Sequence, residues 1–389
     1  MKRRSTTDTP SSLGYSMRAE WAAHAATWLG WPHNKSDWPG KFQPIPWVYA
    51  EIVRNLARHE RVEILVQDAG AEEQARRVLD KANAFSENVR FHRGTTNRGW
   101  MRDSAPIFVK GQGTRDKGQG KQRNHTSRVP RPVSLAPSSL SPAPCPSSLA
   151  AVNFRFNAWA KYPDWQQDER ASERIVKWAG VPAFRPEVNG HRVVLEGGSI
   201  DTNGRGLLLS TEECLLSDVQ CRNPGLSRDD LETVLADYLG IEKVLWLERG
   251  IAGDDTHGHV DDITRFVAED TVVTAVEPNT ADENHEPLRR NLDRLRRATD
   301  IEGRKLQIVE LPMPAPVVFQ RRRLPASYAN FYIANGVVLV PVFNDRNDRV
   351  ALNILSQLFA SREVVPIYCG DLIWGLGAIH CMTQQQPGC

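Results

Sequence analysis

The sequence predicts an α/β protein built from a recurring unit of strand, turn, strand, helix and strand. The composition is that of a globular chain, with 40% hydrophobic and 25% charged residues. The unit recurs about five times, and one of its turns is a strong hairpin signal. From periodicity alone two arrangements stay open: five units closed into a ring around a central cavity, or an ordinary α/β domain with hairpins.

The clearest unit occupies residues 328–368. Its two strands flank the Ala-Asn-Gly turn, a helix is expected over 347–360, and a third strand follows at 363–368. In a second copy, 263–276 is expected to form the two strands, 283–299 the helix and 305–311 the third strand. In a third copy, the corresponding ranges are 198–211, 227–240 and 242–247. Two looser copies lie earlier in the chain. In one, 26–32 precedes a helix near 47–59 and the strand 61–67. In the other, the segments 101–109 and 153–159 precede a helix near 171–180.

The bulk properties exclude several classes of protein. A net charge of +2 and a pI near 8.2 favour neither nucleic acid nor membrane as a partner. The six cysteines include no Cys-x-x-Cys pair, which is typical of reduced thiols in a reducing compartment. We find no secretory signal and no apolar run of membrane-spanning length, so we expect a soluble cytoplasmic protein.

Two segments differ from the rest of the chain. We expect residues 1–16 to be a disordered tail and residues 17–389 to form a single catalytic domain. A disordered insertion interrupts that domain at about 110–148, where a near-duplicate GQGTRDK/GQGKQRN precedes a Ser/Pro-rich tract. The alternative for the insertion is an arm that binds nucleic acid or a partner, but no aromatic residues alternate with its charges.

Four clusters of chemically active residues lie at the edges of these units. They are GWMRDSAP with Trp100, Arg102 and Asp103; VVLEGGSID with Glu196; GDDTHGHVDD at 253–262; and GLGAIHC, which ends at Cys381. Taken singly, Glu196 before two glycines could be a simple turn. Asp103 could form a surface ion pair with an arginine, and Trp100 could belong to the core.

The third cluster is the richest. It contains four aspartates and two histidines: Asp254, Asp255, His257, His259, Asp261 and Asp262. A metal site is one interpretation, because two histidines flank a glycine. No third histidine or paired cysteine follows at a familiar zinc spacing, so a proton-transferring histidine among carboxylates is favoured and no metal is expected.

Cys381 has two interpretations. A lone cysteine is usually a small buried hydrophobe, but a nucleophilic cysteine needs a nearby acid–base group and a stabilised thiolate. The excess of carboxylates indicates a cationic substrate, and a planar guanidinium pairs bidentately with carboxylates. Attack of the Cys381 thiolate on the guanidinium carbon requires neither a metal nor an organic cofactor.

Together these motifs resemble the agmatine deiminases of the bacterial-type peptidylarginine deiminase family. The resemblance runs in order from Glu20 to Pro387 and includes EWAAHAATWLGWPHN, WMRDSAPIF, RFNAW, LEGGSID, GDDTHGHVDD and GLGAIHCMTQQQP. It implies a five-bladed α/β propeller (pentein) of ββαβ units around a pseudo-five-fold axis. It also implies hydrolysis of agmatine to N-carbamoylputrescine and ammonia, a step of putrescine synthesis.

The resemblance assigns roles to individual residues. It implies Cys381 as nucleophile and His259 as general acid and base, and His257, His380 and Cys389 as supporting or peripheral residues. The implied guanidinium-binding carboxylates are Asp103, Glu196, Asp255 and Asp261, with Trp100 as an aromatic wall and Asn330 as a further pocket residue.

Two alternatives remain open. A deiminase of free or peptidyl arginine would need an arginine-lined outer pocket, and the conspicuous arginine cluster, 321–323, is interpreted as a solvated loop. A protein that binds polyamines or guanidines without catalysis is the second alternative, and the complete Cys/His/carboxylate set argues against it. The sequence leaves the oligomeric state open, a homo-oligomer included.

Overall fold

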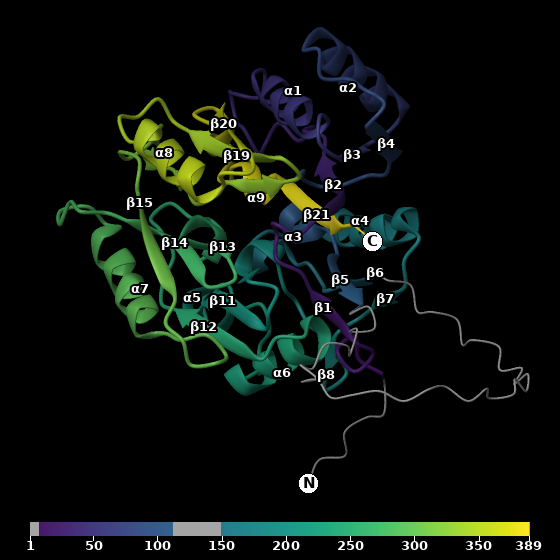
Figure 1. Cartoon of the computed structure of the whole chain (residues 1–389). Coiled ribbons are helices and arrows are strands. Elements are labelled where there is room, and N and C mark those ends of the chain that lie inside the picture. Colours follow the sequence, from purple (N-terminus) through teal and green to yellow (C-terminus); the bar gives the residue numbers. More distant parts are fainter. Residues whose placement is uncertain (1–7, 112–148, 389) are drawn as a thin grey trace, which may run out of the picture.

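The structure is a computed structural model that describes residues 8–111 and 149–388. These residues form a mixed α/β fold, as expected, with five sheets of three or four strands (Figure 1). The expected insertion lies outside the described residues apart from its first two positions, which belong to a strand. No helix of the described ranges is long and apolar enough to cross a membrane.

Each sheet repeats one pattern, which is clearest near the C-terminus. Strand β18 (Tyr332–Ala334) pairs antiparallel with β19 (Val337–Val342), and β19 pairs in parallel with β20 (Glu363–Tyr368). Helix α8 (Asp348–Leu358) makes the crossover. Gly336 has a φ of 72°, the left-handed conformation that the predicted Asn-Gly turn requires.

Two further sheets follow the same order of pairing. One contains β10 (Asp201–Thr202), β11 (Leu207–Thr211) and β12 (Lys243–Leu247), with α5 (Glu212–Leu216) and α6 (Arg228–Leu239) before its third strand. The other contains β13 (Thr264–Ala268), β14 (Thr271–Val276) and β15 (Gln307–Pro312), with α7 (His285–Arg297) as crossover. The helices α6, α7 and α8 agree with the ranges predicted from the sequence to within a few residues.

The C-terminal segment completes the sheet of the N-terminal unit. The strand β21 (Thr383–Pro387) pairs antiparallel with β2 (His24–Gly30), which pairs in parallel with β3 (Arg61–Val66). The sheet contains β4 (Val89–Arg93) as well, and its helices are α1 (Ile45–Leu56) and α2 (Ala69–Lys81). This pairing attaches the segment that carries Cys381 to the start of the chain.

The last residues of the predicted N-terminal tail belong to a sheet. Strand β1 (Tyr15–Met17) pairs antiparallel with β5 (Ile107–Gly111), so residues 15 and 16 are ordered. The sheet continues through β6 (Leu149–Val152) and β7 (Ala183–Phe184), with α4 (Gln166–Ala179) as crossover. A three-residue strand is too short to show periodicity, and its order comes from burying Tyr15 and Met17 against this sheet.

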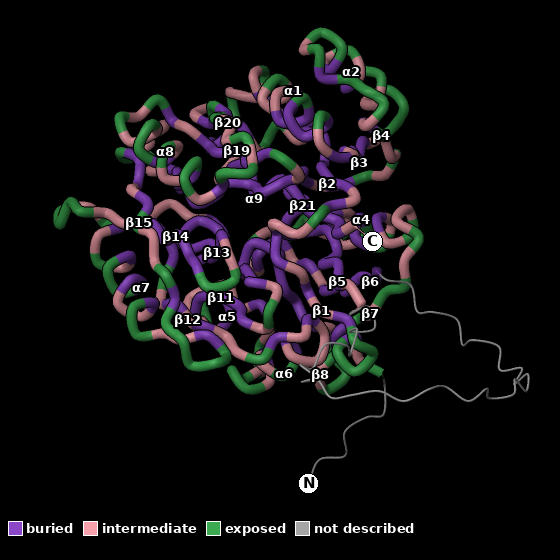
Figure 2. The backbone as a smooth tube through the Cα atoms, in the orientation of Figure 1, coloured by how far each residue is buried: buried purple, intermediate pink, exposed green. Residues whose placement is uncertain are grey.

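Amphipathic helices cover the outside of the molecule. In α7 the leucines at 288, 292 and 295 recur at helical spacing and are buried, whereas its many arginines face outward. Figure 1 shows α1, α2, α6, α7 and α8 at the periphery and α9 (Ile379–Met382) near the middle. Exposed segments lie mostly on the outer loops and helices, and buried segments toward the centre (Figure 2).

Short helical segments precede strands of four sheets, and they contain or directly follow most of the candidate residues. They are α3 (Met101–Ser104), α9, and the 3₁₀ segments η2 (Gly197–Ser199) and η3 (Val260–Asp262). Segment α3 contacts both α9 and η2, and η2 contacts η3. The fold thereby gathers residues that are up to 280 positions apart.

The remaining elements are short and lie in connections. They are the hairpins β8 (Glu187–Val188) with β9 (His191–Arg192) and β16 (Val318–Phe319) with β17 (Arg322–Arg323), and the 3₁₀ turns η1 (Ala158–Ala160) and η4 (Leu372–Gly375).

Candidate active site

Cys381 lies in α9 at the inner end of a pocket, and only 6% of its surface is exposed. The side-chain amide of Asn330 donates to its sulfur at 3.2 Å, and the sulfur lies 3.7 Å from Asp261 Oδ2. Burial, followed by Asp261 and two further aspartates, raises the pKa of this thiol well above its ordinary value. Without a bound cation the sulfur is therefore protonated, and a cation beside it would favour the thiolate.

His259 lies directly before η3 and is surrounded by carboxylates. Its Nδ1 is 3.9 Å from Asp103 Oδ1 and 4.0 Å from Asp261 Oδ1, and its Nε2 is 3.8 Å from Glu196 Oε2. Burial opposes the charged ring, but the carboxylates, Asp103 foremost, raise the pKa of His259 well above its ordinary value. The imidazolium is thus the resting form, and it is poised to donate a proton.

Asp103 and Glu196 have opposite electrostatic environments. Burial raises the pKa of Asp103 to about 6, assisted by the neighbouring carboxylates and opposed by His259. Burial acts on Glu196 as well, but the guanidinium of Arg222, 3.2 Å from Oε1, outweighs it and lowers the pKa of Glu196 to about 2. Glu196 is therefore a permanent anion, whereas Asp103 can change its charge near neutral pH.

A chain of buried ionic contacts holds Asp261. His380 Nδ1 lies 2.7 Å from Asp261 Oδ2, and His380 Nε2 lies 2.8 Å from Glu20 Oε2. The His380 ring therefore bridges two buried carboxylates. Glu20 also accepts from Arg102 and Arg265, at 3.1 and 2.8 Å. Arg102 thus forms a buried network and not the surface pair with Asp103 that the sequence had left open.

The pocket in front of Cys381 has a volume of about 430 Å³. Trp100 forms one wall and lies 5.4 Å from Trp38, measured between ring centroids. Asp103 and Cys381 line the inner end of the same pocket, and Asp255 and Arg322 line another part of it. A flat cation fits this combination of aromatic wall, carboxylates and thiol.

Close packing around the carboxylates requires glycine at position 198. A Cβ atom there would lie 2.6 Å from His259 Nδ1 and 2.9 Å from Asp103 Oδ1. The backbone N–H of Gly198 donates to the same Asp103 oxygen at 3.0 Å. Glycine at this position therefore allows the side chains of His259 and Asp103 to approach the backbone closely.

Asp255 lies away from the inner carboxylates. It accepts from Lys161 and from the hydroxyl of Tyr162, both at 2.6 Å, and pairs with Arg322 at 3.1 Å. Burial opposes its charge, but Lys161 and Tyr162 lower the pKa of Asp255. Arg322 is about half exposed, in agreement with the interpretation of 321–323 as a solvated segment, but it also lines the pocket and pairs with Asp255, which the sequence did not indicate.

The two histidines of the acidic cluster do not act together. His257 has a φ of 65°, and its Nε2 lies 3.3 Å from Ser217 Oγ. It lines a separate cavity, so a metal site shared with His259 is not formed. The left-handed backbone at His257 prevents the strand-like alternation that would place both histidines on one face.

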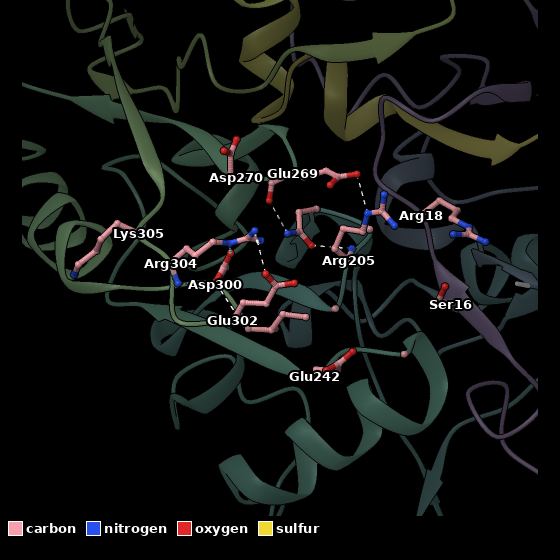
Figure 3. Close-up of a pocket in the computed structure, with 15 residues that line it drawn as sticks. Ser16, Arg18, Arg205, Glu242, Glu269, Asp270, Asp300, Glu302, Arg304 and Lys305 are labelled. Carbon is pink, nitrogen blue, oxygen red and sulfur yellow. Dashed lines mark hydrogen bonds and ion pairs between the residues drawn. The ribbon is translucent and has the colours of Figure 1, made fainter. Parts of the chain in front are cut away.

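A larger cavity, of about 750 Å³, lies elsewhere (Figure 3). Arginines and acidic residues line it, among them Arg18, Arg205, Glu269 and Arg304, and none of the candidate residues does. Several of these charges pair with one another, as Arg205 does with Glu269 at 2.7 Å. The described residues that line it include neither a cysteine nor a histidine.

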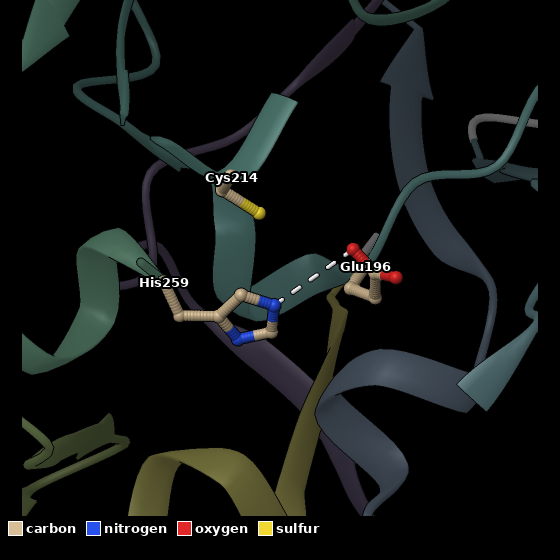
Figure 4. A group of neighbouring side chains, drawn as sticks. All are labelled: Glu196, Cys214 and His259. Carbon is tan, nitrogen blue, oxygen red and sulfur yellow. Dashed lines mark ion pairs between the residues drawn. The ribbon is translucent and has the colours of Figure 1, made fainter. Parts of the chain in front are cut away.

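Three important neighbours of the site were not assigned from the sequence. Trp159 Nε1 donates to Asp103 Oδ2 at 2.8 Å, Arg222 pairs with Glu196, and Cys214 approaches His259 and Glu196 (Figure 4). Trp159 lies in the RFNAW motif, but its indole has no local pattern that distinguishes it from a core tryptophan. Arg222 could have been suspected only by asking what neutralises a buried glutamate.

Fold and site together define a class: α/β enzymes with a thiol and carboxylates in one pocket and a histidine held among buried carboxylates beside it. The chain belongs to the Porphyromonas-type peptidyl-arginine deiminase family, whose model matches residues 16–387.

Relatives in this family support both the fold and the class. The chain is 33% identical over 404 residues to the agmatine deiminase of Ectopseudomonas mendocina, with 98% of each protein covered. Among solved structures, the agmatine deiminase of Enterococcus faecalis is 28% identical, with a TM-score of 0.82 and 99% of each chain covered. A cysteine-to-serine variant of the C. jejuni agmatine deiminase with substrate bound is 26% identical, with a TM-score of 0.77 and 96% coverage.

Proposed function

We propose that this enzyme hydrolyses agmatine to N-carbamoylputrescine and ammonia. The observation that carries the proposal is the shared position of Asp261, which lies 3.7 Å from the Cys381 sulfur and 4.0 Å from His259 Nδ1. A nucleophile and a proton donor on either side of one carboxylate are what attack on a guanidinium needs. The agmatine deiminases that the chain resembles over nearly its whole length support the choice of substrate.

The inner pocket would hold the guanidinium. Asp103, which lines the pocket, accepts its N–H groups, and Asp261, which lies 3.7 Å from the sulfur behind the lining, balances its charge, while Trp100 packs against its flat face. Asn330 orients the sulfur through the hydrogen bond to Sγ. Glu196 does not line the pocket, so we assign it to the positioning of His259, although it was expected to bind substrate.

The outer pocket would hold the other end of the substrate. Asp255 is the carboxylate there, and the aminobutyl chain of agmatine ends in an ammonium that can pair with it. Lys161 and Arg322 already contact this carboxylate, so substrate binding displaces at least one of them. The displacement of Lys161 or Arg322 by the substrate sets a preference among guanidines that carry different groups at the end away from the guanidinium.

Catalysis proceeds in two halves. The bound cation stabilises the thiolate of Cys381, which attacks the guanidinium carbon. The imidazolium of His259 gives its proton to one amino group, the C–N bond breaks, and ammonia leaves an amidino group on the sulfur. Neutral His259 then takes a proton from water while the oxygen adds to the same carbon. Collapse breaks the C–S bond, the added hydroxyl passes its proton to the departing sulfur, and the ureido product leaves with the Cys381 thiol restored.

The same proposal covers the architecture and the cellular setting. The five sheets would form the blades of a closed α/β propeller, and the β2–β21 pairing, which joins the two ends of the described chain, supports closure. We further propose one catalytic domain, interrupted at about 110–148, a cytoplasmic location, a role in putrescine synthesis, and no nucleic-acid partner. A homo-oligomer is compatible with this proposal.

A substrate comparison tests the function. We would incubate the protein with agmatine, with arginine and with a peptidyl-arginine, and measure the ureido product. Turnover of agmatine alone, lost in Cys381→Ala, is expected. Product from arginine but not from agmatine would overturn the substrate assignment, and equal turnover in Cys381→Ala would overturn the mechanism.

One observation favours the arginine alternative enough to keep it in that assay. Arg322 and Lys161 are partly exposed around Asp255, with side-chain exposures of 48% and 39%, and both can pair with an α-carboxylate. An Asp255→Asn variant separates the cases. It should raise the KM for agmatine if the ammonium binds there, and lower the KM for arginine if a carboxylate does. Binding of agmatine without any turnover would instead support the non-catalytic alternative.

A further inference from the structure

A second buried cysteine lies beside the candidate acid–base histidine. Cys214 belongs to the short helix α5, after strand β11, and is 1% exposed. Its sulfur, a carboxylate oxygen of Glu196 and a ring nitrogen of His259 all lie within 4.8 Å of one another. Figure 4 shows the three side chains converging from separate segments, with the sulfur directed toward the ring and the carboxylate.

Two of these groups have polar atoms without a hydrogen bond. In the described part of the chain, neither His259 Nε2 nor Glu196 Oε2 has a hydrogen-bond partner, although both are fully buried. Their separation of 3.8 Å is too long for a hydrogen bond. Buried polar atoms in this condition are uncommon, and an ion between them would satisfy both.

The separation is close to that of two ligands on one metal ion. Tetrahedral zinc with bonds of about 2.0–2.3 Å places its ligand atoms roughly 3.3–3.8 Å apart. The nitrogen and the oxygen already match this spacing, and the sulfur has to move inward by on the order of 1 Å. A set of thiolate, imidazole and carboxylate is also the chemistry that zinc prefers over calcium or magnesium.

The surrounding carboxylates favour a cation, although a metal ion has to displace the proton of the resting His259 imidazolium and that of the Cys214 thiol. Asp103 and Asp261 lie within 4.0 Å of the other ring nitrogen of His259. Arg222 opposes a cation, but it pairs with Glu196 Oε1 and leaves Oε2 free to bind. We propose that Glu196, Cys214 and His259 form a site for Zn²⁺ or a similar soft divalent cation, and that its occupation inhibits the enzyme.

Inhibition follows from the position of the site, and this part rests on the proposed function. A metal on His259 holds the ring that would otherwise exchange protons with the leaving ammonia and the attacking water. None of the three ligands lines the 430 Å³ pocket, so agmatine and the ion do not compete for one space. Entry of the ion requires local opening, and we therefore expect inhibition to develop slowly and to act mainly on kcat.

Direct binding tests the site without relying on activity. We would titrate Zn²⁺ into the Cys381→Ala variant and into Cys381→Ala/Cys214→Ser by calorimetry, with circular dichroism to verify that both are folded. One ion per chain should bind to the first variant, and roughly two orders of magnitude more weakly to the second. Equal affinities, or no binding to the first, would overturn the site whatever the enzyme's substrate is.

Two controls make the assignment specific. Cys369→Ala in the Cys381→Ala background removes another fully buried thiol, and it should leave Zn²⁺ affinity unchanged. Co²⁺ in place of Zn²⁺ should give a thiolate-to-metal charge-transfer band in Cys381→Ala that disappears with Cys214→Ser. If that double variant does not fold, the band in Cys381→Ala still decides, since its absence shows that no thiol binds the ion.

Kinetics tests the inhibitory part. We would preincubate enzyme that retains Cys381 with Zn²⁺ and compare treated with untreated rates within each variant. The ratio of the Zn²⁺-treated to the untreated rate should fall below one in the otherwise unchanged protein and stay close to one in Cys214→Ser. Inhibition that persists in Cys214→Ser and is competitive with agmatine would place the ion on Cys381 and contradict our assignment.

Discussion

Replacing Arg222 by methionine would leave a fully buried carboxylate without its counter-ion. Arg222 and Glu196 are both completely buried, and their closest atoms are 3.2 Å apart. The pKa of Glu196 is about 2 instead of 4.5, a difference that corresponds to about 3 kcal/mol of folding free energy at neutral pH. Removing one partner of a buried ion pair typically costs about 3–5 kcal/mol of folding free energy. The value from the pKa of Glu196 therefore agrees with the typical cost.

The stability lost in Arg222→Met should depend on pH in a definite direction. A carboxylate whose pKa is lowered by folding stabilises the protein above its unfolded value of 4.5, and this contribution disappears as pH falls toward 2. The stability difference between the unchanged protein and Arg222→Met should therefore be largest above pH 5 and should narrow in more acidic solution. Urea unfolding of both proteins at several pH values between 4 and 8 measures it.

A double-mutant cycle separates the ion pair from the other contacts of Arg222, which also donates to the carbonyl oxygens of Gln220 and Thr256. Glu196→Gln combined with Arg222→Met removes the unpaired charge, so it should be more stable than Arg222→Met alone. A loss below about 1 kcal/mol in Arg222→Met would refute the reasoning. A double variant no more stable than that single variant would refute it as well.

Three further predictions concern catalysis. Gly198→Ala should lower kcat by about 100-fold, because a Cβ 2.6 Å from His259 Nδ1 displaces the ring; unchanged steady-state kinetics would contradict this. Trp159→Phe removes the donor to Asp103 Oδ2, so the pKa of Asp103 should rise above about 6. The acidic limb of the pH profile of kcat/KM should then move to higher pH, and a move to lower pH would contradict this prediction. Treatment with a metal chelator should not lower kcat, since Cys381 and His259 supply the nucleophile and the proton, and a loss that added Zn²⁺ restores would argue for a metal enzyme.

Local features of the sequence were enough to predict the elements of the fold. The spacing of leucines identified α7, and the Asn-Gly turn identified the hairpin of β18 and β19, because helical and strand periodicities arise from backbone geometry within a few residues. The addition of α2 and β4 to the first sheet was missed, as was β1. A short strand becomes stable only through the neighbour that it pairs with, and that neighbour can be distant in the chain.

The candidate residues divide in the same way. Cys381, His259 and Asp103 stood out because their residue types occur in chemically dense clusters, and the resemblance to a family then gave them roles. The tertiary structure alone places His259 among the buried carboxylates and directs His257, whose backbone is left-handed, to Ser217.

The charge states at the site depend on the tertiary structure alone. Glu196 is a permanent anion because Arg222, 26 positions later, is buried against it, and Asp103 lacks such a partner and has a pKa near 6. Arg322 reaches the pocket only through the fold of its hairpin. A sequence specifies which groups can ionise, whereas burial and pairing in three dimensions determine the free energy of each ionised form, because Coulomb and desolvation energies depend on distances in space.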